Sequence, residues 1–106
     1  MLDCFIEQKS QQLTFYISGF LRGRLKYSEL HLFVWDTLEE WSQFQVSSHL
    51  PQSYREQVFW HLLHQLECWP ENALRQNRRL RRNILDCVGY LQGKGHLPIN
   101  CIGIRP

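Results

Sequence analysis

The side chains with the clearest capacity for chemistry in this chain are arginines in one short stretch. They are Arg75, Arg78, Arg79, Arg81 and Arg82. Guanidinium groups stay charged and form forked hydrogen bonds with carboxylates and phosphates. On one continuous helix, four of them follow the spacing i, i+3, i+4 and i+7, with Arg81 nearer the edge. The stretch therefore predicts an arginine ridge on one helix face.

Three interpretations of this ridge remain open. It can be a solvated face, or it can pair with acidic residues of this chain or of a second copy. It can bind a protein partner with an acidic surface, because arginine is well suited to interfaces. It can also contact nucleic acid through phosphates, with base contacts from Gln76, Asn77 or Asn83. Between the two partners we expect the protein, because no aromatic residue interleaves the ridge and the net charge is only +2.

A second group of residues has the spacing of metal ligands. A helix would place His61, His64 and Cys68 within about 60° of one another. One helix rarely directs three ligands at one tetrahedral ion, and a fourth ligand would have to come from His31, His49 or His96. The three are therefore weak candidates. We expect a polar helix flank there, with no metal and no other cofactor.

The remaining reactive groups do not form a catalytic motif. The four cysteines Cys4, Cys68, Cys87 and Cys101 are far apart and none belongs to a C-x-x-C pair, so we expect buried, reduced thiols. The sequence has no G-x-S-x-G, no phosphate loop, no G-x-G-x-x-G and no H-E-x-x-H. We therefore expect that the protein is not an enzyme.

Hydrophobic periodicity predicts the helices that must position these residues. Apolar side chains recur at spacings of three and four residues, which places them on one helix face. The pattern predicts helices over residues 2–21 and 28–45, a third that begins at Ser53, and a fourth between Pro70 and Gly93. Loops are expected near Gly23 and over residues 46–52.

Two helix starts carry capping signals. Ser53 and Glu56 have the spacing of a capping box, in which the Ser53 hydroxyl accepts the Glu56 amide and the Glu56 carboxylate accepts the Ser53 amide. Ser28 can cap the second helix, with Glu29 in its first turn. The second helix also carries Leu32 and Trp35 outside its main stripe. We expect that helix to be central in the bundle and the broad apolar surface to favour a homodimer.

After Gly93 the pattern changes to an extended tail over residues 94–106. Its apolar residues are Leu97, Ile99, Cys101, Ile102 and Ile104. Fully burying one large apolar side chain contributes about 1.5–3 kcal/mol, so we expect the tail to lie across the bundle with these side chains covered.

Composition and charge complete the expected description. Residues 27–71 hold seven acids and one base, whereas residues 72–106 hold seven bases and one acid. The start of the chain lacks the basic segment of a signal peptide, and no run approaches the about 20 apolar residues that cross a membrane. The sequence predicts an all-α protein, with residues 1–106 forming a single domain of about four helices with an extended tail. We expect a non-catalytic cytoplasmic interaction or regulatory module, with a small DNA- or RNA-binding regulator as the alternative.

Overall fold

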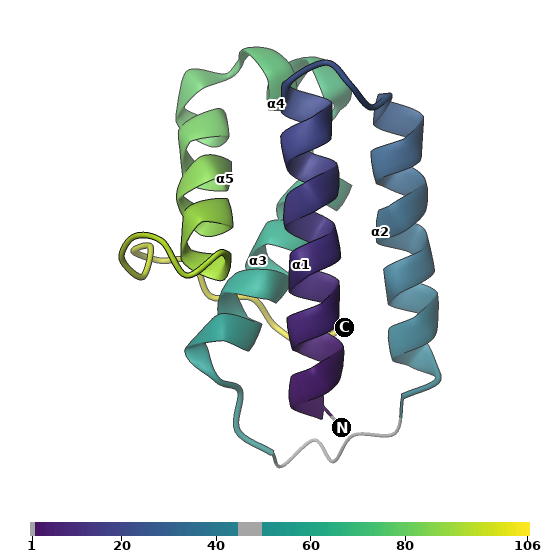
Figure 1. The fold of residues 1–106 in the computed structure, drawn as a ribbon, viewed down its shortest axis with the longest axis vertical. Helices are drawn as coiled ribbons and strands as arrows, with labels where there is room; N and C mark the ends of the chain where they lie inside the picture. Colours follow the sequence, from purple (N-terminus) through teal and green to yellow (C-terminus); the bar gives the residue numbers. More distant parts are fainter. Residues whose placement is uncertain (1, 45–49) are drawn as a thin grey trace.

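A computed structural model describes residues 2–44 and 50–106, and all regular structure in these residues is helical. The five helices of this part are α1 (Leu2–Leu21), α2 (Tyr27–Ser42), α3 (Tyr54–Cys68), α4 (Glu71–Gln76) and α5 (Arg78–Leu91). They form a small bundle (Figure 1). The predicted all-α fold is confirmed. Of the predicted loop 46–52, residues 46–49 lie outside the described residues.

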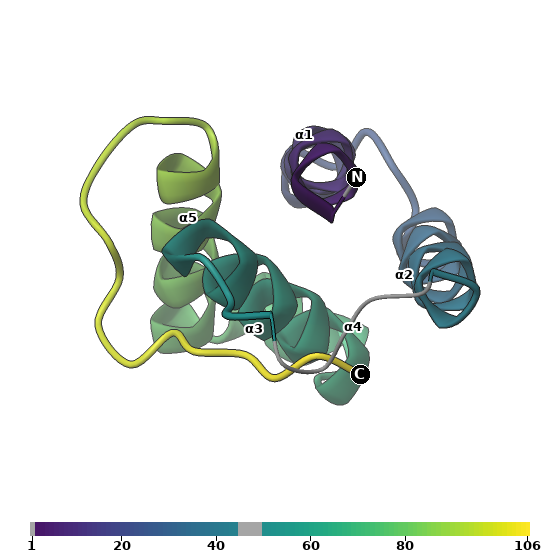
Figure 2. The same ribbon diagram turned by 90° about the horizontal axis from the view of Figure 1, so that it is seen from below.

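The core of the bundle forms around α1 and α3, and the expectation of a central second helix is wrong. α1 and α3 pack against each other and each also packs against α2 and α5, whereas both views show α2 at one side of the bundle (Figures 1 and 2). The buried residues of α2 are Leu30, Phe33, Val34, Thr37 and Trp41. They form one stripe toward α1 and α3. Leu32 and Trp35 point away from that stripe and are 61% and 56% exposed.

The capping box at the start of α3 is only half formed. The Ser53 Oγ accepts the Glu56 amide at 3.1 Å, as predicted. The Glu56 carboxylate does not return to the Ser53 amide, because it lies buried and accepts hydrogen bonds from Trp60 and Arg105. A tertiary contact therefore replaces a local one.

The start of α2 also differs from the prediction. The N-cap is Lys26, two residues before Ser28, and the Glu29 carboxylate accepts the Lys26 amide at 3.3 Å. Ser28 lies inside the first turn and is exposed. The acidic side chain, and not the predicted hydroxyl, stabilises this helix end.

The two serines give a matched pair of stability variants. Replacing Ser53 with alanine should lower the free energy of unfolding by about 1 kcal/mol, because the Glu56 amide loses its acceptor. Replacing Ser28 with alanine should leave it nearly unchanged, because Ser28 is not the cap. Urea denaturation of both variants measures the difference. Equal losses in the two variants would contradict the assigned caps.

The helical pattern after Pro70 divides in two at Asn77. Asn77 has an extended backbone, with φ −76° and ψ 109°, and its Oδ1 accepts the Leu80 amide at 3.0 Å. Leu74 and Leu80 are both buried. Six residues on a straight helix would separate them by about 120°. The break at Asn77 lets both side chains enter the core, which is why the fold has one helix more than the periodicity predicts.

After a turn at residues 99–100, the tail runs across α3 in an extended conformation, as predicted (Figure 2). The Gly103 amide donates to the Gln57 carbonyl at 2.9 Å. A Cβ on Gly103 would overlap the His61 backbone nitrogen and come within 2.5 Å of the Trp60 carbonyl carbon. Glycine therefore permits this close approach. Farther along, Arg105 forms a two-pronged ion pair with Glu56.

The expectation that the apolar side chains of the tail are buried is wrong for most of them. Cys101 is buried, whereas Ile99, Ile102 and Ile104 are 85%, 68% and 86% exposed. Successive side chains of an extended segment point to opposite sides. Cys101, Gly103 and Arg105 therefore face the bundle and Ile102 and Ile104 face outward, whereas Ile99 lies in the turn of residues 99–100 that precedes this extended segment. Backbone contact and an ion pair hold the tail in place of hydrophobic burial.

Candidate functional site

The predicted arginine ridge does not exist as one face. Arg75 belongs to α4, and Arg78, Arg79, Arg81 and Arg82 belong to α5. The extended backbone at Asn77 separates the two helices, so the helical spacing that would align Arg75 with the others does not apply. The five arginines divide into two groups with different surroundings.

Arg75 and Arg81 have structural contacts. The Arg75 guanidinium carbon lies 4.0 Å from the centre of the Phe20 ring, and Nη1 donates to the Phe20 carbonyl at 3.1 Å. Its Nε pairs with Glu71 at 3.0 Å. Arg81 donates from Nη1 to the Arg75 carbonyl at 3.3 Å. These two arginines join α4 to α1 and to α5.

Arg78, Arg79 and Arg82 remain exposed to solvent. Within the described residues, none of them forms a salt bridge, whereas Lys9, Arg55, Arg75 and Arg105 each pair with a carboxylate. Pairing with the acidic residues of α2 in the same molecule does not occur, because α5 and α2 lie on opposite sides of the bundle (Figure 2).

The position of Arg78 and Arg79 in the first turn of α5 opposes helix stability. The first turn of α5 contains arginines and no acidic residue. A helix N-terminus carries a partial positive charge of about +0.5, so a cation there is unfavourable by roughly 0.3–1 kcal/mol when it is exposed. A bound anion at this end would relieve the repulsion.

The turn between α1 and α2 adds three exposed cations, Arg22, Arg24 and Lys26, at the same end of the bundle. This turn, α4 and the start of α5 all lie at the top of Figure 1, and the contact of Arg75 with Phe20 joins them. We call the exposed cations of this end the basic end. Its members are Arg22, Arg24, Lys26, Arg78, Arg79 and Arg82.

The sequence pattern predicted only a loop near Gly23, and half of the basic end was therefore missed. The order of the helices could have revealed it. In an up-and-down bundle, the connections after the first and third helices lie at the same end. This order predicts that the cations of both connections lie close together.

The three predicted metal candidates do not converge. His64 Nε2 lies 3.3 Å from Cys68 Sγ, and both residues are exposed. His61 faces α5 instead, where its Nε2 lies 3.1 Å from Asn83 Oδ1. Of the residues named as a fourth ligand, His49 lies outside the described part of the chain. The helical spacing alone did not bring three ligands to one point.

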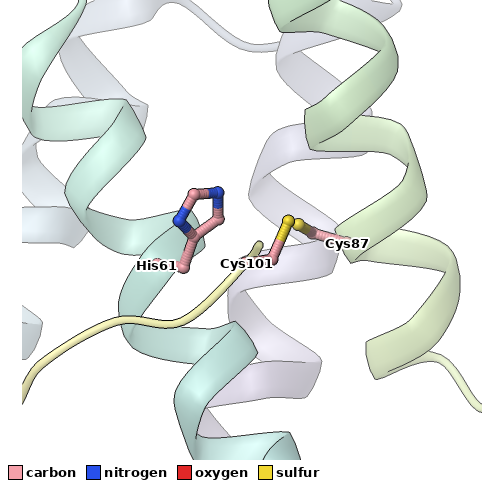
Figure 3. Close-up of side chains that lie close together, drawn as sticks. All are labelled: His61, Cys87 and Cys101. Atoms are coloured by element: carbon pink, nitrogen blue, oxygen red, sulfur yellow. The ribbon is translucent and has the colours of Figure 1, made fainter. Parts of the chain in front are cut away.

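His61 instead belongs to a cluster with Cys87 and Cys101, which we call the thiol-histidine cluster (Figure 3). The three residues come from α3, α5 and the tail, and their ligand atoms all lie within 4.8 Å of one another. The two cysteines are buried. Burial raises the pKa of the Cys87 thiol, and the neighbouring Cys101 raises it further.

The prediction of buried free thiols holds for these two cysteines and is wrong for the other two. Cys4 and Cys68 are free but exposed. Cys4 lies on the outer side of the first turn of α1, and Cys68 ends α3. Cys4 and Cys68 are exposed because they lie on the outer faces of their helices. The residue type alone does not reveal this position.

A groove of about 940 Å³ lies beside the cluster. Its walls come from α2, α3 and the last residues of the tail, and His61 and His64 are among the residues that line it. The outward isoleucines Ile102 and Ile104 form part of the same wall. The groove gives solvent a route toward His61.

Comparison with known protein families, with curated proteins and with solved structures finds no match to this chain. Among the described residues, no helix combines the length and the apolar character needed to span a membrane.

Proposed function

We propose that this protein is a non-catalytic, cytosolic interaction or regulatory module whose basic end binds an acidic protein surface. The observation that carries the proposal is the gathering of six exposed cations from two distant segments at one end of the bundle. In the described residues, Arg78, Arg79 and Arg82 have no salt-bridge partner. Arginine forms forked, charge-assisted hydrogen bonds with carboxylates.

The other residues on the exposed side of α5 favour a protein partner. Leu85 is 48% exposed and follows Arg78 by seven residues and Arg82 by three, so it lies beside them on the same face. Asp86 is also exposed and follows Arg82 by four residues. A leucine and a carboxylate next to the arginines are typical of a surface that binds a protein through both apolar and charged contacts. The Asp86 charge would repel a phosphate backbone.

The alternative is a small DNA- or RNA-binding regulator. The arginines in the first turn of α5 favour it, because phosphates bind at helix N-termini. The sequence-based expectation of a homodimer also stays a prediction, for which the exposed Leu32 and Trp35 of α2 supply apolar surface.

Two labelled probes separate the partner classes. Fluorescence anisotropy would follow a glutamate-rich peptide containing leucine and a short duplex DNA, each titrated with the full chain. The triple variant R78Q/R79Q/R82Q should weaken peptide binding at least tenfold, because each lost charge removes a carboxylate contact. Duplex binding should stay weak and change little. The variant should fold at least as stably as the original, because it removes cations from a helix N-terminus.

Lys94→Gln is the matched control, since Lys94 is an exposed cation beyond the other end of α5. It should leave peptide binding unchanged. Tight duplex binding at physiological salt, with a logarithmic salt slope that falls by about 0.9 for each arginine removed, would establish the alternative. Absence of binding to either probe at low salt would contradict both functions.

A further inference from the structure

The thiol-histidine cluster lies apart from the basic end and has no part in the proposed function. We propose that His61, Cys87 and Cys101 bind one zinc ion, which fastens the tail to α3 and α5. Two thiolates and an imidazole are ligands that zinc prefers. Because the ligands come from three separate elements, a bound ion would connect segments that are otherwise held by noncovalent contacts.

The separation of the ligand atoms suits a tetrahedral ion after a small movement. Zinc lies about 2.3 Å from sulfur and about 2.0–2.1 Å from nitrogen, so tetrahedral ligand atoms are about 3.6–3.8 Å apart. The three atoms already lie within 4.8 Å of one another. Figure 3 shows the two sulfur atoms together with the His61 ring beside them. Closing by about 1 Å requires changes of side-chain torsion and no refolding.

Asn83 restrains two of the three ligands. Its Nδ2 donates to Cys101 Sγ at 3.3 Å, and its Oδ1 lies 3.1 Å from His61 Nε2. Asn83 and Cys87 are four residues apart on α5 and therefore lie on the same side of that helix. Hydrogen bonds from such outer groups orient metal ligands.

The fourth ligand position can be filled from the groove. His61 is partly exposed and lines this groove of about 940 Å³, so water can reach the ion from that side. Three protein ligands with water in the fourth position hold zinc in catalytic sites, so a fourth protein ligand is not required to bind the ion. By contrast, the exposed pair His64 and Cys68 offers two ligands on one helix.

Titration with cobalt(II) tests the site directly on the full chain, reduced and free of chelator. One equivalent should give the thiolate-to-cobalt charge-transfer absorption of a tetrahedral site, and zinc(II) should displace it. The variants Cys87→Ser, Cys101→Ser and His61→Gln should each weaken zinc binding at least tenfold. The double variant H64Q/C68S is the matched control, with the same residue types on an exposed face, and should bind as tightly as the original.

Thiol alkylation of the unaltered protein keeps the test independent of how the variants fold. Mass spectrometry would follow the four cysteines with and without zinc. Zinc should slow alkylation of Cys87 and Cys101 and leave the exposed Cys4 and Cys68 unaffected. The proposal is overturned if zinc protects no cysteine, if cobalt gives no charge-transfer band, or if H64Q/C68S is the variant that loses the metal.

Discussion

Replacing Arg105 with alanine should lower the free energy of unfolding by about 3 kcal/mol and release the tail from α3. The Arg105 guanidinium donates to both oxygens of Glu56, whose side chain is 3% exposed. Removing one partner of a buried ion pair leaves an uncompensated charge, which costs about 3–5 kcal/mol. We expect a loss at the lower end of this range, because the released tail can move away from α3 and expose the Glu56 carboxylate to water. Urea denaturation measures the loss.

The double variant R105A/E56Q tests the cause of this loss. If R105A loses stability because the Glu56 charge is buried without a partner, the double variant should be more stable than R105A alone. Equal stability of the two variants would contradict that explanation. The single variant E56Q serves as the reference for a neutral side chain of the same shape, and the three measurements with the original protein complete a double-mutant cycle.

The same ion pair should show its own pH dependence within this experiment. Burial alone would raise the pKa of Glu56, but hydrogen bonds from Arg105 and Trp60 and the Arg105 charge outweigh it and hold the pKa below its ordinary value of 4.5. The pair therefore contributes its full stability above pH 4.5 and loses it as pH falls through the lowered pKa. The difference between the original protein and R105A should shrink over that acidic range.

Replacing Gly103 with alanine should displace the tail as strongly. The new Cβ would come within 2.5 Å of the Trp60 carbonyl carbon and within 2.7 Å of the Trp60 Cβ. These atoms belong to the core helix α3 and cannot yield, so the tail must move outward. The Gly103 hydrogen bond to Gln57 would break, and Arg105 would leave Glu56. We expect a loss of about 3 kcal/mol, at the upper end of the usual range for overpacking.

Ile104→Ala is the matched control for Gly103→Ala, because it places the same methyl group on the adjacent tail residue, which is 86% exposed. Its stability should stay within about 0.5 kcal/mol of the original. Limited proteolysis would report tail release, with rapid cleavage near residues 94–106 in the Gly103 variant only. Unchanged resistance in that variant would show that the tail does not pack closely on α3.

The sequence determined the local features of this protein. The extent of α1, the Ser53 cap, the corner at Pro70 and the end of the last helix before Gly93 all follow from residues within one or two helical turns. Helix periodicity and caps depend on neighbours in the chain, so their signals can be read without the fold. The arginines were visible for the same reason, as residues of one type close together.

The tertiary structure decided which of those residues are exposed to solvent and which distant residues contact them. Arg75 stacks on Phe20, far away in the sequence, and the helix break at Asn77 follows from the burial of both Leu74 and Leu80. The cations of the α1–α2 turn join the basic end because of helix order, and His61 meets Cys87 and Cys101 because α5 and the tail pack on α3. Each of these contacts joins segments that are far apart in the sequence, so no local residue spacing predicts it. The packing of the apolar helix faces determines where the segments lie, and the contacts are therefore visible only in the folded chain.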